Sequence, residues 1–257
     1  MNTFTKVLNV LRLAFFPISY GLTGALIGGT LNRILIADLG YAATVVGIFF
    51  ALPLLISPVR VWIGYRSDGF PIWGKRREPY MIIGALVTAV GAILAVLLAL
   101  NSNPGDGLMI VAIGVAFIVF GFGRNLGHNS FQALIADKFT PAGRNRAITL
   151  YEVATLLGLV MGAGGLGAAL EDFDAGRLVM VTLVICVIVV VLSIIAALGN
   201  EPATEESRVA AQQAREMPFP QALREVVLAD PQVRLFFAIV LFTFLGTLAQ
   251  DVLLEPY

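Results

Sequence analysis

Residues 80–100 read YMIIGALVTAVGAILAVLLAL, an apolar stretch without a charged side chain. The hydrocarbon core of a bilayer is about 30 Å thick and an α-helix rises about 1.5 Å per residue, so about 20 apolar residues cross it. The stretch therefore predicts a transmembrane helix. The composition agrees, because 58% of the 257 residues are hydrophobic and only 13% are charged. So few charges cannot cover a water-facing surface.

Six further stretches meet the same criterion, and together they predict an all-α, polytopic transmembrane bundle. The seven predicted spans are 13–37, 42–64, 80–100, 108–127, 146–170, 178–198 and 232–254. The polar stretch 199–231 is expected to be a cytoplasmic linker. It separates a six-helix bundle over 1–198 from residues 232–257, which hold the seventh helix.

The basic residues are distributed unequally between the two sides of these spans. Fifteen lie on one side, whereas only Arg33 and Arg177 lie on the other. Short cytoplasmic loops are enriched in Lys and Arg, so this asymmetry predicts a cytoplasmic N-terminus. The 17 basic and 17 acidic residues balance, and no global positive field favours nucleic acid.

The reactive residues give no support for an enzyme. The single cysteine, Cys186, lies in an apolar stretch and allows no internal disulfide. One histidine cannot build a multi-histidine metal site, and the sequence has no Ser-His-Asp arrangement or phosphate-binding loop. We therefore expect neither catalysis nor a metal centre.

A short repeat relates the first and seventh spans. Gly29-Thr30-Leu31 recurs as Gly246-Thr247-Leu248, and an acid, Asp38 or Glu255, stands nine residues after each glycine. The repeat predicts that the seventh helix is the counterpart of the first in a six-plus-six duplication. The chain is then expected to be cut short after its seventh helix. A true seven-helix protein is the alternative.

Ionisable side chains in apolar helices usually face the bundle or a cavity, because their exposure to lipid is costly. Arg124 ends the predicted fourth span, and Glu152 lies about two turns into the fifth from the same side, so the two are placed to pair. With His128 and Asn129 they are the candidate ligand-binding residues. Alternatively, Arg124 extends to the headgroups and His128 is an ordinary hydrogen-bonded side chain.

At the predicted outer face, Arg33 and Asp251 lie at similar depths, each about 20 residues into its helix. A pair between Arg33 and Asp251 or Glu255 would latch the outer entrance. The alternative is that these are independent interfacial charges.

The loop after the second span resembles a signature of the major facilitator superfamily. In that family a glycine lets two helices approach, an acid follows four residues later, and a basic cluster comes next. Gly64 and Asp68 keep this spacing, and Gly74 precedes the bases 75–77, which are Lys75, Arg76 and Arg77. Gly74 lies six residues past Asp68, which departs from the usual pattern. Alternatively, the loop is a basic anchor that only orients the protein.

Two further features point to the same superfamily. Asp137 and Arg144 follow the fourth span with a spacing similar to the one that the superfamily has there. In the fifth span, Gly158 and Gly162 are four residues apart and predict a flat face for helix packing. The resemblance implies a major facilitator-like fold, with one six-helix half followed by the seventh helix.

Several segments together resemble one branch of the superfamily, the PucC/LhaA group of bacteriochlorophyll delivery proteins from photosynthetic bacteria. The insertion before Gly74 is typical of this branch, and the resemblance covers the whole chain. The segments that carry it include Leu31-Asn32-Arg33-Ile34, Pro58-Val59-Arg60, Gly74 to Tyr80, Gly127 to Leu134 and Gln250 to Tyr257.

The resemblance implies a membrane factor that assists assembly of light-harvesting antenna complexes, by handling bacteriochlorophyll or by chaperoning antenna polypeptides. Its implied partners are lipid, antenna polypeptides and pigment-synthesis enzymes, with bacteriochlorophyll bound transiently. The implied location is a bacterial inner membrane, cytoplasmic or photosynthetic intracytoplasmic. One alternative is an ion-driven transporter of a small solute that uses Glu152. The other is a structural membrane partner without a ligand.

Overall fold

The computed structural model describes residues 10–201, 209, 212, 218–228 and 230–254. Over these residues the regular elements are helices, apart from one isolated bridge between Ile72 and Lys75. Six helical segments in this part of the chain are long and apolar enough to cross a membrane. The predicted all-α, multi-pass membrane bundle is therefore confirmed.

The helical elements follow one another in an up-and-down order. The first span comprises α2 (Phe15–Gly24) and two wide-turn segments, η1 (Ala25–Leu31) and η2 (Ile34–Asp38). The others are α3 (Ala43–Leu55) and α4 (Val59–Gly69) in the second span, α5 (Glu78–Leu100), α6 (Gly107–Lys138), α7 (Pro141–Ala169), α8 (Ala175–Ala197), α10 (Phe219–Ala222), η3 (Leu223–Leu228) and α11 (Pro231–Leu254).

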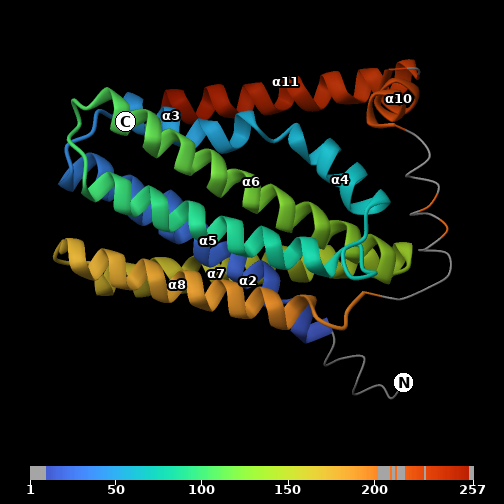
Figure 1. Cartoon of the computed structure of the whole chain (residues 1–257), viewed down its shortest axis with the longest axis horizontal. Helices are drawn as coiled ribbons and strands as arrows, with labels where there is room; N and C mark the ends of the chain where they lie inside the picture. Colours follow the sequence, from blue (N-terminus) through green and yellow to red (C-terminus); the bar gives the residue numbers. More distant parts are fainter. Residues whose placement is uncertain (1–9, 202–208, 210–211, 213–217, 229, 255–257) are drawn as a thin grey trace.

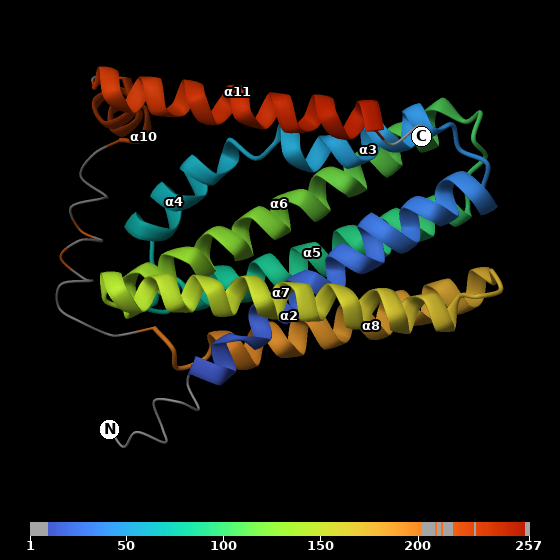
Figure 2. The same cartoon turned by 180° about the vertical axis from the view of Figure 1, so that it is seen from behind.

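The long helices pack side by side, as short connections between successive helices require (Figures 1 and 2). The most extensive contact joins α5 to α6, and α2 packs on both α7 and α8. The broken second span, α3 and α4, packs on α6. Both views show α11 along the side of the bundle that α3 and α4 form.

Glycines allow the closest helix contacts. A Cβ atom added to Gly91 of α5 would lie 2.3 Å from the backbone nitrogen of Phe120 in α6. Where α2 crosses α7, a Cβ on Gly158 would lie 2.2 Å from the carbonyl oxygen of Ile18. Apolar burial gives little driving force between helices in lipid, so close backbone packing of this kind has to hold them together.

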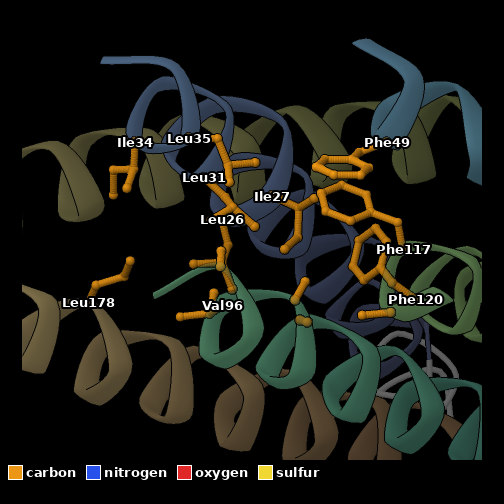
Figure 3. Packing of buried hydrophobic residues seen from close by; sticks show 14 of the residues in the cluster. Leu26, Ile27, Leu31, Ile34, Leu35, Phe49, Val96, Phe117, Phe120 and Leu178 are labelled. Atoms are coloured by element: carbon orange, nitrogen blue, oxygen red, sulfur yellow. The ribbon is translucent and has the colours of Figure 1, made fainter. Parts of the chain in front are cut away.

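One large apolar core contains residues from each of the first six spans, including Leu166 of α7 and Leu178 of α8. Figure 3 shows Leu26 and Leu31 of η1 directed toward Val96 of α5, while Phe49 of α3 faces Phe117 of α6. The two phenyl rings stack with centroids 5.5 Å apart. This core fixes the half of the bundle that lies away from the α4–α5 loop.

The fourth helix is longer than its apolar stretch predicted. The predicted end at residue 127 is wrong, because α6 continues to Lys138. Two polar side chains along it bond inside the protein: Ser130 Oγ donates to the Leu126 carbonyl at 2.8 Å, and Asn125 Oδ1 accepts from Arg60 Nε. Arg124 and His128 therefore lie within the helix and not at its end.

The fifth helix begins earlier than residue 146. Thr140 caps α7, since its hydroxyl accepts from the Gly143 amide at 3.4 Å, and Pro141 occupies the first helical turn. The loop expected between the fourth and fifth helices is thus reduced to Phe139 and Thr140, which puts Asp137 at the end of one helix and Arg144 at the start of the next.

Candidate functional site

The bases of the loop after the second span join three helix ends. Arg77, only 5% exposed, precedes α5 and pairs with Asp68 of α4 at 2.5 Å and with Asp137 of α6 at 3.1 Å. Arg76 adds longer contacts of 3.9 Å to Asp68 and 3.5 Å to Asp137. We call Asp68, Arg76, Arg77 and Asp137 the charge network, and the end of the bundle that carries it the basic end.

The other residues of this motif have separate local roles. Gly64 faces Asn129, whose Nδ2 would lie 3.7 Å from a Cβ added there, so α4 and α6 approach each other at this point. Gly74 has a φ of +75°, a left-handed conformation that glycine adopts without strain. Lys75 pairs with Glu78 at 2.5 Å. Arg144 donates to the Ala136 carbonyl at 2.8 Å and is not part of the charge network.

Glu201 also contributes to the basic end, although sequence reasoning did not select it. Its carboxylate accepts from the backbone amides of Arg76 at 2.7 Å, Arg77 at 2.9 Å and Glu78 at 3.3 Å. In return, the Glu201 amide donates to Glu78 Oε1 at 2.8 Å. Glu201 thus caps the N-terminus of α5. It follows the sixth span and is 125 residues from Arg76 along the sequence, so no sequence spacing relates the two.

We expect the Glu201→Ala variant to unfold more easily, by about 1 kcal/mol, because several amides at the start of α5 lose their acceptor. Unfolding by sodium dodecyl sulfate in mixed micelles, followed by circular dichroism, measures the change. Glu171→Ala is the control, since Glu171 is exposed between α7 and α8 and has no ion pair within the described residues. Equal stability of both variants would contradict the cap.

A polar site lies inside the bundle where α6 meets α2. The Arg124 guanidinium donates to Thr23 Oγ1 at 2.6 Å and to the Tyr20 carbonyl at 3.2 Å. Its Cζ atom also lies 3.6 Å from the centroid of the Tyr20 ring, a cation–π arrangement. Arg124 is therefore bound to α2 and does not extend freely toward the headgroups.

His128 is one helical turn from Arg124 and belongs to a chain of rings. It stacks on Tyr20 with centroids 5.0 Å apart and contacts Tyr151 of α7 at 5.5 Å. Phe131 and Phe16 continue the chain, at 5.3 Å and 4.8 Å. We call these five residues the aromatic cluster. Within the described residues His128 Nδ1 is buried and has no hydrogen-bond partner.

The pairing of Arg124 with Glu152 is not formed in this structure. Glu152 is exposed on α7 and takes part in no ion pair among the described residues, whereas Arg124 is held by Tyr20 and Thr23. Their sequence positions alone did not show which neighbouring helix each of the two residues faces. Glu152 instead lines a cavity of about 150 Å³ with Tyr151 and Arg144.

The latch predicted at the opposite end is only partly described. Arg33 Nη2 donates to the Leu170 carbonyl at 3.0 Å, so it satisfies the C-terminal end of α7. Asp251 lies in α11, but its side chain is outside the described structure, and Glu255 is outside the described residues. The Arg33 pair with Asp251 or Glu255 stays a prediction.

Comparison with known proteins identifies relatives along almost the whole chain. "Uncharacterized protein in puhA-bchM intergenic region" from Rhodobacter capsulatus is 34% identical, over 96% of this chain and 53% of the relative. "Protein PucC" from the same organism is 32% identical, over 96% and 55%. "Bacteriochlorophyll synthase 44.5 kDa chain", also from Rhodobacter capsulatus, is 28% identical, over 97% and 56%. The chain thus spans about half the length of the curated relatives it matches.

A family model described as PUCC protein matches residues 30–257. The match includes the charge network, Arg124, and all of the aromatic cluster except Phe16 and Tyr20. The predicted resemblance to the PucC group is therefore confirmed. This chain belongs to the PUCC protein family.

Proposed function

We propose that the chain forms part of a membrane factor that assists assembly of light-harvesting antenna complexes, by handling bacteriochlorophyll, chaperoning antenna polypeptides, or both. The observation that carries the proposal is the family match over residues 30–257. The name of one relative refers to bacteriochlorophyll. The role is non-catalytic, and its partners are antenna polypeptides and pigment-synthesis enzymes in a bacterial photosynthetic or cytoplasmic membrane.

The aromatic cluster is the part of the chain best suited to contact a pigment. His128 Nδ1 is a buried nitrogen without a partner in the described structure, and a neutral imidazole is a common metal ligand. The Tyr20 and Tyr151 rings pack beside it and make its surroundings aromatic. The neighbouring cavity of about 150 Å³ is smaller than pockets that enclose drug-sized ligands, about 300–1,000 Å³. The described residues would therefore hold one edge of a pigment and leave the rest in lipid.

The test is an absorption spectrum of the protein purified in mild detergent from a phototrophic host that lacks antenna polypeptides. We expect bacteriochlorophyll in the wild-type preparation. In His128→Phe an aromatic ring remains but both imidazole nitrogens are lost, so the pigment-to-protein ratio should fall about tenfold, equivalent to about 1.4 kcal/mol of binding.

The matched control is Tyr151→Phe, which removes only a hydroxyl from the neighbouring ring and should retain pigment. Unchanged pigment in His128→Phe would remove His128 from the site. A colourless wild-type protein would remove pigment handling altogether and leave the polypeptide chaperone, which co-purification of antenna polypeptides then tests.

An ion-driven transporter is the second candidate. The observation that favours it is the exposed position of Glu152 on α7. An exposed carboxylate on a membrane-spanning helix is costly in lipid and is typical of a group that faces a water-filled path. Gradient-driven uptake of a solute that is abolished in Glu152→Gln would support this candidate. The same uptake in wild type and variant would exclude Glu152 as the coupling group.

A further inference from the structure

The second span is broken, and the break opens a groove on the outside of the bundle. Pro58 separates α3 from α4, and the amides of Val59 and Arg60 bond to carbonyls three residues earlier instead of four. Beside the break lies a cavity of about 540 Å³, lined only by apolar residues that include Leu55, Val87 and Val119. Figure 1 shows the break where α3 gives way to α4, next to α6.

A second cavity, of about 390 Å³, continues this groove toward the basic end. The two cavities share Phe122 of α6, and the second is lined by Trp62, Arg66 and Tyr80. Val87 comes seven residues after Tyr80 in α5, so the apolar cavity lies about 10 Å deeper along the helix. The groove is therefore apolar in the interior of the membrane and polar at its end.

Arg66 provides a positive charge at the mouth of the groove. Its Cζ atom lies 4.1 Å from the centroid of the Phe70 ring, and the side chain is exposed. In the described part of the chain it has no carboxylate partner, because nearby Asp68 pairs with Arg76 and Arg77. Tyr80 fixes the rim by donating to the Phe70 carbonyl at 2.8 Å. The mouth is thus a positively charged site next to the apolar part of the groove.

We propose that this groove binds one anionic phospholipid, with its phosphate at Arg66 and an acyl chain along Pro58, Val87 and Phe122. Charge complementarity selects the occupant, because a basic pocket between transmembrane helices matches a negative headgroup joined to a hydrocarbon chain. The location agrees, since Leu86 and Val90 of α5 are exposed apolar side chains, as expected of a helix face that contacts lipid. Trp62, 41% exposed, has the amphipathic ring expected near the headgroups.

The chain contains its own probe for this lipid. It has two tryptophans, and Trp73, which is 86% exposed in the loop before α5, is not among the residues that line the groove. In a Trp73→Phe background, only Trp62 fluoresces as tryptophan. The full chain is reconstituted in vesicles of dioleoylphosphatidylcholine that contain increasing fractions of brominated phosphatidylglycerol or brominated phosphatidylcholine. Quenching of Trp62 reports which lipid occupies the groove.

We expect brominated phosphatidylglycerol to bind at Trp62 about fivefold more strongly than brominated phosphatidylcholine. This factor corresponds to the attraction between one basic residue near a membrane surface and an anionic lipid. Arg66→Gln should abolish the preference, and Arg66→Lys should retain it. Arg146→Gln, which removes a charge from α7 at the same end, is the matched control and should also retain it. Val119→Phe, which fills the apolar cavity, should lower the preference while Arg66 remains.

Three results would overturn the proposal. Equal quenching of the wild type by both lipids would mean that Trp62 meets only bulk lipid. Absence of quenching by either lipid would mean that a protein segment covers the groove. A preference that persists in Arg66→Gln would assign the headgroup to another part of the surface and reject the role of Arg66.

Discussion

The Gly158→Leu variant is expected not to form the six-helix bundle. A Cβ on Gly158 would lie 2.2 Å from the Ile18 carbonyl oxygen and 2.9 Å from its Cα, distances that packed side chains do not reach. The obstacle is backbone of α2, which no rotamer change can move aside. Across the same contact, a Cβ on Gly21 would lie 2.1 Å from the Thr155 carbonyl. The helices would have to separate, at a cost of about 3 kcal/mol or more.

Unfolding in mixed micelles of increasing sodium dodecyl sulfate content, monitored by circular dichroism, measures this loss. Gly158→Ala provides a milder variant, because its single methyl group meets the same carbonyl and should already lower the midpoint. The matched control is Gly165→Leu in the same helix, where nothing lies within 4 Å of the added Cβ. A wild-type midpoint for Gly158→Ala would refute the close α2–α7 contact.

The glycine face of the fifth span shows what a sequence reveals about packing. The spacing of Gly158 and Gly162 correctly indicated a face for a neighbouring helix, and both contact α2. Gly164, Gly165 and Gly167 look similar in the sequence but meet open space. Which glycine contacts the neighbouring helix depends on where the two helices cross. The rotation and the offset of the helices at that crossing do not follow from the glycine spacing along one helix.

The polar residues illustrate the same limit. Sequence composition identified Arg124 as an unusual charge in an apolar segment, and the structure places it in a polar site. Its partners on α2, Tyr20 and Thr23, carry no charge, so opposite-charge reasoning selected Glu152 instead. Helix ends were missed for a related reason, because hydropathy marks the apolar part of α6 and not the turns that continue beyond it.

Loss of the Arg77 side chain is the other change from which we expect a large effect. In Arg77→Gln, the carboxylates of Asp68 and Asp137 lose the base that lies between them, at 2.5 Å and 3.1 Å. Removing one partner of a fully buried pair costs about 3–5 kcal/mol, and exposed pairs contribute about 0–1 kcal/mol. Arg77 is buried but its partners are partly exposed, which places the expected cost near 2 kcal/mol.

A double-mutant cycle separates this pairing from the packing of the Arg77 stem. Asp137→Asn removes one of the two acids, and in the Arg77→Gln background it should cost less than in the wild type. The expected coupling is about 1 kcal/mol, measured by the same unfolding assay. Arg146→Gln serves as the control, since Arg146 is exposed on α7 and has no ion pair within the described residues.

The position of the charge network explains why its loss should destabilise more than one helix contact. Asp68 ends α4, Arg77 precedes α5 and Asp137 lies near the end of α6, so one guanidinium holds three helices together at the basic end. Arg77→Gln should therefore also expose the start of α5 and speed hydrogen exchange of its first amides, while α8 stays protected. Additive cycle energies together with unchanged exchange at α5 would show that Arg77 does not hold the three helices together through these carboxylates.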